Sequence, residues 1–414
     1  MKRTLSPAWL LTILTGLNLF NYLDRFVLSS VLPEVQRELG LNDDQGGTLA
    51  TAFMLGYFVT SPFFGYLGDR LPRKWLIALG IFVWSLGTVL SGFATGFWSL
   101  ICFRVLVGLG EASYATISPS LIADRFFGTK RNTALTIFYV AIPVGAALGS
   151  MLGAQIASSS SWRHAFIWSG APGLLLALAL LPFADTPRVE APGEAKPTVR
   201  DGLRLFCSPN YMLVVLGYVA YTFALGGFQH WAPSFFVREH GLPLGRAGTL
   251  FGGIMVVAGL IGTFVGGFTA SAWQKRTPAG YAWLLGWSVA AAMPCALLSL
   301  TLRDTTAALA MLGVAMFLLF LSVGPVNTLI LETAPAQLRA SAMAVSIFMI
   351  HLFGDLWSPK IVGVISTHSS LGRGVLILPL ALIPAALLWL LLAVRMRRLA
   401  PAQSQVPQSP MPAE

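Results

Sequence analysis

The chain has 414 residues, of which 55% are hydrophobic and only 11% charged, and its mean hydropathy is +0.71. A soluble domain needs a polar surface that this composition cannot supply, so the composition excludes one and indicates a protein of the lipid bilayer. The formal net charge of +10 does not require a nucleic-acid partner, because the basic residues are distributed as they are in membrane proteins.

Apolar stretches long enough to cross a bilayer, about 20 residues each, recur twelve times along the chain. We predict membrane-spanning helices at residues 7–33, 46–67, 73–93, 97–122, 131–158, 163–183, 209–237, 246–272, 279–301, 305–332, 338–366 and 371–395. The long polar interruption at 184–208 contains three prolines and alternating charges, which is typical of a linker. We therefore expect an all-α membrane protein in two pseudo-symmetric halves. Its parts are six-helix bundles at 1–183 and 209–398, a cytoplasmic linker at 184–208 and a disordered cytoplasmic tail at 399–414.

The first predicted span follows Lys2 and Arg3, as the apolar core of a secretory signal peptide would. It contains Asp24 and Arg25, however, and no small-x-small cleavage site closes it, so we interpret it as a retained helix. The three cysteines stand singly in or beside spans and indicate neither a disulfide framework nor a metal site.

The basic residues outside the spans lie mainly on one side of the predicted bilayer. With the N-terminus in the cytoplasm, 18 of the 27 lysines and arginines lie on the cytoplasmic side. The opposite side holds Arg37, Arg163, Arg238, Arg246, Arg303 and Arg373, together with acids that balance them. The positive-inside rule therefore places both termini in the cytoplasm. Short loops and the lack of an Asn-x-Ser/Thr acceptor fit a multi-pass protein of a bacterial inner membrane, which we expect to be a monomer.

The turn between the second and third predicted spans carries a charged motif. Residues 65–74 read Gly-Tyr-Leu-Gly-Asp-Arg-Leu-Pro-Arg-Lys, which resembles the major facilitator superfamily signature Gly-x-Leu-Ala-Asp-Arg-x-Gly-Arg-Lys, with Pro72 in place of a glycine. A degraded copy occupies 267–276, and the spacing of Asp124 and Arg131 recurs in Glu332 and Arg339. These repeats agree with the two parallel six-helix halves, central cavity and rocking motion that the resemblance implies.

The resemblance also implies that this turn is a conformational latch. Asp69 would accept hydrogen bonds from a helix N-terminus of the other half, or pair with Arg73 or Arg131, and so stabilise the outward-facing state. The alternative is that Asp69 only satisfies its own turn. The expected latch comprises Gly65, Gly68, Asp69, Arg70, Arg73, Lys74, Asp124 and Arg131.

Six ionisable residues lie within the predicted spans: Asp24, Arg25, Arg104, Glu111, Asp355 and Lys360. A charge at the bilayer centre costs about 2.5–3.5 kcal/mol on insertion scales, so these residues mark a functional site. Counting the helical rise from the membrane surface places Asp24 between Arg104 and Glu111 in depth. We expect Asp24 to pair with Arg104, and Glu111, without an adjacent cation, to respond to protons. The alternative is a static ion pair between the first and fourth spans.

Three segments narrow the resemblance to the spinster family. They are Asn-Tyr-Leu-Asp-Arg at 21–25, Arg-Val-Leu-Val-Gly-Leu-Gly-Glu-Ala-Ser-Tyr at 104–114 and His-Leu-Phe-Gly-Asp-Leu-Trp-Ser-Pro at 351–359. Spinster proteins move lysophospholipids or sphingosine phosphates, with proton coupling at an acid of the first helix and a pair on the fourth. The resemblance therefore implies proton coupling at Asp24, Arg104 and Glu111, with the proton gradient as driving force and no cofactor or metal.

We expect a secondary active transporter, not an enzyme, whose partners are the bilayer, protons and a small amphiphilic lipid. The expected substrate-binding residues are Arg104, Glu111, Asn21, Tyr139, Tyr221, His351 and Asp355. His351 and Asp355 share a helix face, where they either receive a head group or form a packing hydrogen bond. A proton-coupled exporter of hydrophobic drugs is the alternative. A membrane-embedded acyl or head-group transferase using His351 as base lacks a nucleophile or metal cluster and leaves the repeated turn unexplained.

Overall fold

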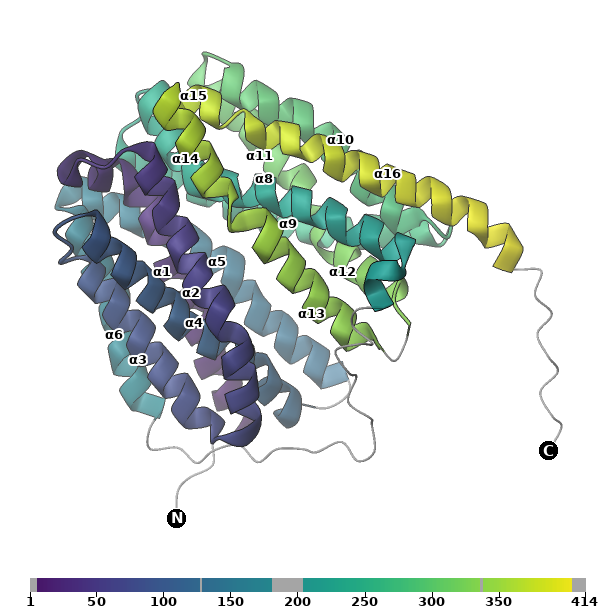
Figure 1. Ribbon diagram of the computed structural model, residues 1–414, viewed down its shortest axis with the longest axis horizontal. Helices are drawn as coiled ribbons and strands as arrows, with labels where there is room; N and C mark the ends of the chain where they lie inside the picture. The colour runs from purple at the N-terminus through teal and green to yellow at the C-terminus, as the bar shows by residue number, and fades with distance from the viewer. Residues whose placement is uncertain (1–5, 127–128, 181–203, 336–337, 404–414) are drawn as a thin grey trace.

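A computed structural model describes residues 6–126, 129–180, 204–335 and 338–403, and every regular element in these ranges is helical (Figure 1). The first half comprises α1 (Pro7–Leu39), α2 (Asp43–Arg70), α3 (Arg73–Ser91), α4 (Phe97–Arg125), α5 (Thr129–Ser159) and α6 (Trp162–Leu180). The second half comprises η1 (Leu205–Cys207), α8 (Pro209–Glu239), α9 (Leu244–Gln274), α10 (Gly280–Thr301), α11 (Thr305–Phe320), α12 (Val323–Glu332), α13 (Arg339–Ile350), η3 (His351–Asp355), α14 (Ser358–His368), α15 (Leu371–Gly374) and α16 (Ile377–Gln403).

These helices confirm the predicted all-α architecture with twelve spans. Ten helical segments of the described chain are long and apolar enough to cross a membrane, and α1 and α6 complete the twelve. Three predicted spans are divided: one between α11 and α12, one among α13, η3 and α14, and the last between the short α15 and α16. Most of the predicted linker, and the tail beyond α16, lie outside the described residues, whereas residues 399–403 of the predicted tail continue α16.

A proline follows two of these interruptions by four residues. A proline cannot donate a hydrogen bond to the carbonyl four residues earlier and clashes with it. Pro325 lies four residues after Leu321, where α11 gives way to α12. Pro359 lies four residues after Asp355, the last residue of the π-helical turn η3. The Thr51 hydroxyl donates a hydrogen bond to the Leu356 carbonyl at 2.7 Å. This bond provides a partner for a backbone carbonyl beside the turn, which lipid could not provide.

The two halves meet at one end of the molecule. We call the end that holds the start of α1 and the end of α16 the termini end, and the opposite end, with the α1–α2 turn, the distal end. Figure 1 shows the helices of the two halves converging at the distal end and diverging toward the termini end. The contact between α5 and α9 depends on Gly248, where an added Cβ would lie 2.3 Å from the Ala154 Cβ. Side chains of any size there would hold the distal end apart.

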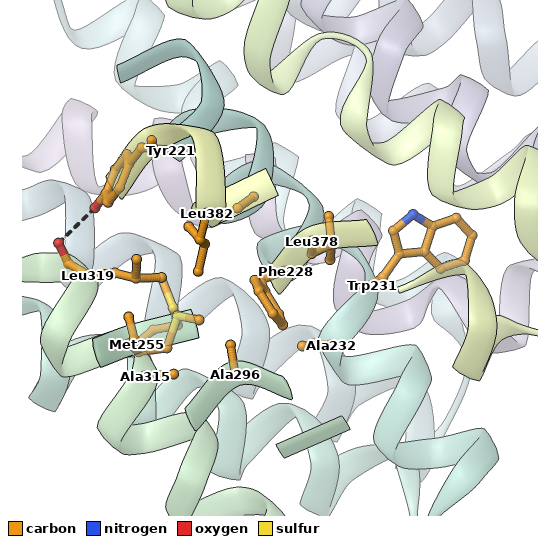
Figure 2. Close-up of a cluster of buried hydrophobic side chains, with 14 of the residues drawn as sticks. Tyr221, Phe228, Trp231, Ala232, Met255, Ala296, Ala315, Leu319, Leu378 and Leu382 are labelled. Atoms are coloured by element: carbon orange, nitrogen blue, oxygen red, sulfur yellow. Dashed lines mark hydrogen bonds between the residues drawn. The ribbon is translucent and has the colours of Figure 1, made fainter. Parts of the chain in front are cut away.

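The second half has its own apolar core, which excludes one predicted binding residue from the cavity between the halves. Figure 2 shows Phe228, Met255 and Leu378 packed in this core, and all three are buried. Tyr221 is also buried, and its hydroxyl donates to the Leu319 carbonyl at 3.0 Å. Tyr221 therefore lies in the packing of the second half.

Candidate substrate cavity and buried charge cluster

A cavity of about 1160 Å³ lies between the halves and is lined by residues from both. Its basic and acidic lining residues are Arg25, Arg104, His230 and Asp355. At about 1.5 Å of rise per residue, Arg104 lies about 10 Å and His230 about 14 Å from the distal ends of their helices, and Arg25 about 21 Å. Arg104 and His230 therefore occupy the deep part of the cavity, near the closed distal end, and Arg25 lies nearer its middle.

The cavity wall nearer the termini end is mainly apolar. Pro143 and Val140 of α5 face this part of the cavity together with Leu260, Phe264 and Phe320 of the second half. These residues lie about 22–30 Å from the distal ends of their helices by the same helical rise. A molecule with a polar head and an apolar chain fits this cavity with its head toward the distal end.

Glu111 of α4 is fully buried and pairs with Arg25 of α1. Its Oε2 atom lies 2.7 Å from Arg25 Nη2 and 3.2 Å from Arg25 Nε. The Arg25 guanidinium also lies over the rings of Tyr22 and Phe53, at 4.8 and 4.9 Å from the ring centroids. The structure therefore differs from the expectation that Glu111 has no adjacent cation. The depth argument missed Arg25 because a rise along the helix axis does not say which way a side chain points.

Asp24 and Arg104 do not form the expected pair. Within the described residues neither Asp24 Oδ1 nor Arg104 Nε and Nη1 has a hydrogen-bond partner, although all are buried. Asp24 Oδ2 lies 3.5 Å from the Thr88 hydroxyl, and Arg104 lies 5.4 Å from the Phe53 ring centroid. Of the expected triad, only Arg104 lines the cavity, while Asp24 and Glu111 are buried behind its wall.

Close helix packing positions this charge cluster. An added Cβ at Gly149 of α5 would lie 2.2 Å from the Leu23 carbonyl oxygen of α1, next to Asp24. An added Cβ at Gly108 of α4 would lie 2.1 Å from the Phe53 carbonyl oxygen of α2. Small residues let helix backbones approach this closely within a membrane, and here they bring the segments around Asp24, Arg104 and Glu111 together.

His351 and Asp355 lie on the π-helical turn, where His351 Nδ1 is 3.0 Å from the Asp355 carboxylate. Asp355 lines the cavity and packs against Gly226 of α8, where an added Cβ would lie 2.6 Å from the Asp355 Cβ. His351 contacts Tyr57 of the first half edge-on, at 6.3 Å between ring centroids. π-helical turns occur frequently at functional sites. The pair thus joins the cavity to the contact between the two halves.

Of the expected substrate-binding residues, the cavity brings together Arg104, Tyr139 and Asp355. Asn21 and Glu111 are buried beside the cavity. His351 lies within hydrogen-bond distance of Asp355, which lines the cavity, and Tyr221 belongs to the core of the second half.

Sequence analysis missed His230 of α8. This imidazole is buried and lines the cavity, and within the described chain its Nε2 atom has no hydrogen-bond partner. The next residue, Trp231, donates from its indole nitrogen to the Pro359 carbonyl of α14 at 3.0 Å. A single histidine on an apolar helix gives no sequence pattern that would separate it from a packing residue.

The residues of the predicted latch lie at the termini end. Arg73 Nη1 lies 2.6 Å from the Asp124 carboxylate, so Arg73 joins the start of α3 to the end of α4. Gly68 packs against Ile117 of α4, and Arg70 lies over the Tyr66 ring. The side chains of Asp69 and Arg131 lie outside the described residues, so the predicted latch contact stays a prediction.

Hydrogen bonds and ion pairs between the halves cluster at the distal end, and we call this group the distal gate. Arg238 of α8 donates to the Asp43 carboxylate at 2.7 and 2.9 Å and to Gln36 at 2.5 Å. Ser366 of α14 donates to Asp43, and Lys360 donates to Asp44 and, at 2.8 Å, to Thr48. Lys360, one of the six ionisable residues of the predicted spans, is thus part of this gate.

This fold, with a cavity between two six-helix halves and buried charges in its wall, is that of a membrane transporter. Residues 14–359 match the model of the Major Facilitator Superfamily, to which the chain belongs. Within it the chain belongs to the spinster family. It is 34% identical to protein spinster homolog 1 of Homo sapiens over 87% of this chain and 74% of that protein.

Two further comparisons agree with this assignment. The chain is 32% identical to the sphingosine-1-phosphate transporter SPNS2 of Danio rerio, over 88% of this chain and 77% of that protein. The fold matches the crystal structure of a bacterial homolog of the human lysosomal transporter Spinster, in an inward-facing and unoccupied conformation. That match has a TM-score of 0.86 at 23% identity and covers 95% of this chain and 98% of that one.

Proposed function

We propose that this chain is a proton-coupled transporter that moves a single-chain lysophospholipid-like or sphingolipid-like amphiphile across a bacterial inner membrane, with both termini in the cytoplasm. The observation that carries the proposal is the polarity of the cavity, with Arg25, Arg104 and Asp355 in its deep and middle parts and an apolar wall toward the termini end. The likeness to a relative named as a sphingosine-1-phosphate transporter supports the same substrate class.

Arg104 is the residue that we propose reads the substrate head group. A guanidinium offers donors in a planar fork that matches phosphate oxygens, and Nε and Nη1 of Arg104 have no hydrogen-bond partner among the described residues. Asp355 lies about 20 Å from the distal end of its helix, somewhat nearer the cavity mouth than Arg104. A head group with a phosphate and an ammonium would therefore present opposite charges to the two residues.

Flux of a labelled lysophospholipid into proteoliposomes, with and without a pH gradient, tests the proposal. We expect wild-type flux to depend on the gradient, and Arg104→Lys to lose most of the flux of 1-oleoyl lysophosphatidic acid. A neutral hydrophobe of equal chain length should be handled alike by both proteins. Transport of the hydrophobe alone would instead favour an exporter of hydrophobic drugs.

We propose that Asp24, Arg104 and Glu111 couple transport to protons, with Asp24 carrying the proton. A buried carboxylate without a paired cation is unfavourable in hydrocarbon, and a bound proton removes that charge. Glu111 already has Arg25 as a partner, so it has less need of a proton while this pair holds.

The assignment predicts that Asp24→Asn still binds substrate but loses the stimulation of flux by a pH gradient. Glu111→Gln, measured beside it, should retain part of that stimulation. If Glu111→Gln abolishes the stimulation and Asp24→Asn does not, the proton belongs to Glu111, as the sequence alone suggested.

A further inference from the structure

Two side chains that line the deep end of the cavity, one from each half, carry buried hydrogen-bonding atoms without a partner among the described residues. Arg104 of α4 contributes Nε and Nη1, and His230 of α8 contributes Nε2; none has a partner among the described residues. Both side chains are more than nine-tenths buried, at 1% and 6% exposure. Both residues line the same cavity at similar depths, about 10 and 14 Å from the distal ends of their helices.

Unmet hydrogen bonds of this kind call for a partner from outside the chain. Nearly all buried polar groups in native proteins have one, and leaving a group without one costs about 1–3 kcal/mol. His230 is also held in place, because the adjacent Trp231 anchors α8 to the Pro359 carbonyl at 3.0 Å. Its position is therefore fixed by packing, while its Nε2 atom is left for a ligand.

We propose that His230 completes the head-group site, so that the anionic phosphate of the substrate is held between Arg104 of the first half and His230 of the second. This proposal rests on the proposed function and adds a specificity residue to it. The guanidinium donates to two phosphate oxygens, and the imidazole donates from Nε2 to a third.

A site divided between the halves depends on the conformation of the transporter. Arg104 moves with α4 and His230 with α8, so the two line one cavity together only while the distal end is closed. Rocking of the halves would separate them and divide the site. The anion therefore binds tightly when it enters from the termini end and is released when the distal end opens, which couples head-group binding to the conformational change.

Binding to the full-length protein in nanodiscs tests the proposal with two probes of equal chain length. The anionic probe is 1-oleoyl lysophosphatidic acid, and the neutral one is 1-oleoylglycerol. We expect His230→Leu to weaken binding of the anionic lipid about tenfold to a hundredfold, the range for a hydrogen bond to a charged group, and to change the neutral lipid less than about twofold. His230→Gln, which keeps a donor, should recover part of the loss.

His164→Leu is the matched control, because His164 is exposed at the distal end and does not line the cavity. Unchanged binding of lysophosphatidic acid in His230→Leu, or an equal loss for both lipids, would overturn the proposal while leaving the transport proposal intact. Failure of the wild-type protein to bind either lipid would overturn both. If inorganic phosphate competes with lysophosphatidic acid in the wild type but not in His230→Leu, the site binds the phosphate alone. If the protein distinguishes the anionic from the neutral lipid without such competition, binding also requires the acyl chain. Either result supports the site.

Discussion

At the residue scale, the main consequence of the structure is that the buried charges are divided into a satisfied pair and two unsatisfied groups. Arg25 and Glu111 neutralise each other at 2.7 Å, whereas Asp24 and Arg104 lack hydrogen-bond partners for the atoms named above. A static ion pair between the helices would require only a satisfied pair such as Arg25 and Glu111, and no unsatisfied groups beside it. The unsatisfied groups are better explained by the ligands that we propose, a proton at Asp24 and an anion at Arg104, each of which binds and dissociates during transport.

The Arg25–Glu111 pair predicts a specific pattern of stability. Removing one partner of a buried pair leaves the other charge uncompensated and costs about 3–5 kcal/mol, whereas replacing both is often neutral. Arg25→Gln should therefore lower the thermal unfolding midpoint in detergent, and Arg25→Gln/Glu111→Gln should recover most of the loss.

Arg37→Gln provides the control for this cycle. Arg37 pairs with Glu34, but its side chain is 77% exposed, and exposed pairs contribute about 0–1 kcal/mol. We expect almost no shift in that variant. A double mutant no more stable than Arg25→Gln would mean that Glu111 is not left uncompensated when Arg25 is removed.

Sequence reasoning identified the ionisable residues of the site but not their partners. Asp24, Arg104, Glu111 and Asp355 stand out because charge inside a span is costly. Which residue a side chain pairs with depends on the direction in which it points around the helix axis. Asp24 and Arg25 point in directions about 100° apart, although their depths are nearly equal. Only the packing of α1 against α5 and of α4 against α2 fixes those directions, and that packing is not visible in hydropathy.

At the element scale, the spans were predictable and the irregularities within them only partly so. Hydropathy defines helix ends closely, as at 97–122 for α4 and 209–237 for α8, because lipid requires continuous apolar helices. Pro325 and Pro359 indicate that a helix is disturbed, but not whether the result is a break or a π-helical turn. That outcome depends on neighbours such as Thr51, which bonds the backbone beside the turn.

The distal gate predicts a shift between conformations. Asp43 accepts hydrogen bonds from Arg238 and Ser366 of the second half, so Asp43→Asn should weaken the distal-closed state. We expect a change of about 1–3 kcal/mol in the equilibrium, a typical coupling free energy. Spin labels at Ser160 and Arg303, exposed positions on opposite halves at the distal end, should show a larger fraction of long distances.

An exposed arginine at the same end gives the control for this measurement. Arg246→Gln changes the net charge of the distal end by one, as Asp43→Asn does in the opposite sense, but Arg246 is exposed at the start of α9. Its distance distribution should match that of the wild type. Distances unaltered by Asp43→Asn would show that the apolar packing of α5 and α9 holds the distal end closed without the gate.

At the scale of the whole molecule, charge and shape agree on the orientation that we propose. Several basic residues at the distal end are paired with acids, as in Arg163 with Glu38 and Arg238 with Asp43. The termini end carries Lys130, Lys275, Arg276 and Arg397, all partly or fully exposed. By the positive-inside rule we expect the termini end to face the cytoplasm, so that the cavity would be accessible from that side while the distal gate is closed.

Alternating access predicts that holding the distal end closed stops transport without stopping binding. Gln155 of α5 contacts Thr249 of α9 across the two halves, at 3.1 Å between Nε2 and Oγ1. In a variant lacking the three native cysteines, Gln155→Cys/Thr249→Cys can be joined by a short bis-methanethiosulfonate cross-linker. It links the two cysteines through disulfides that a reductant cleaves, and it requires less exact geometry than a direct disulfide. Flux in proteoliposomes should fall to background on cross-linking and return on reduction, because both halves must rock for the substrate to leave. Binding of lysophosphatidic acid should persist, since Arg104 and His230 still line one cavity in the closed arrangement.

Either single-cysteine variant treated with the same reagent should retain its flux. Continued flux in the cross-linked protein would mean that the substrate does not leave between α5 and α9, and loss of binding would mean that the closed distal end is not the state that receives it.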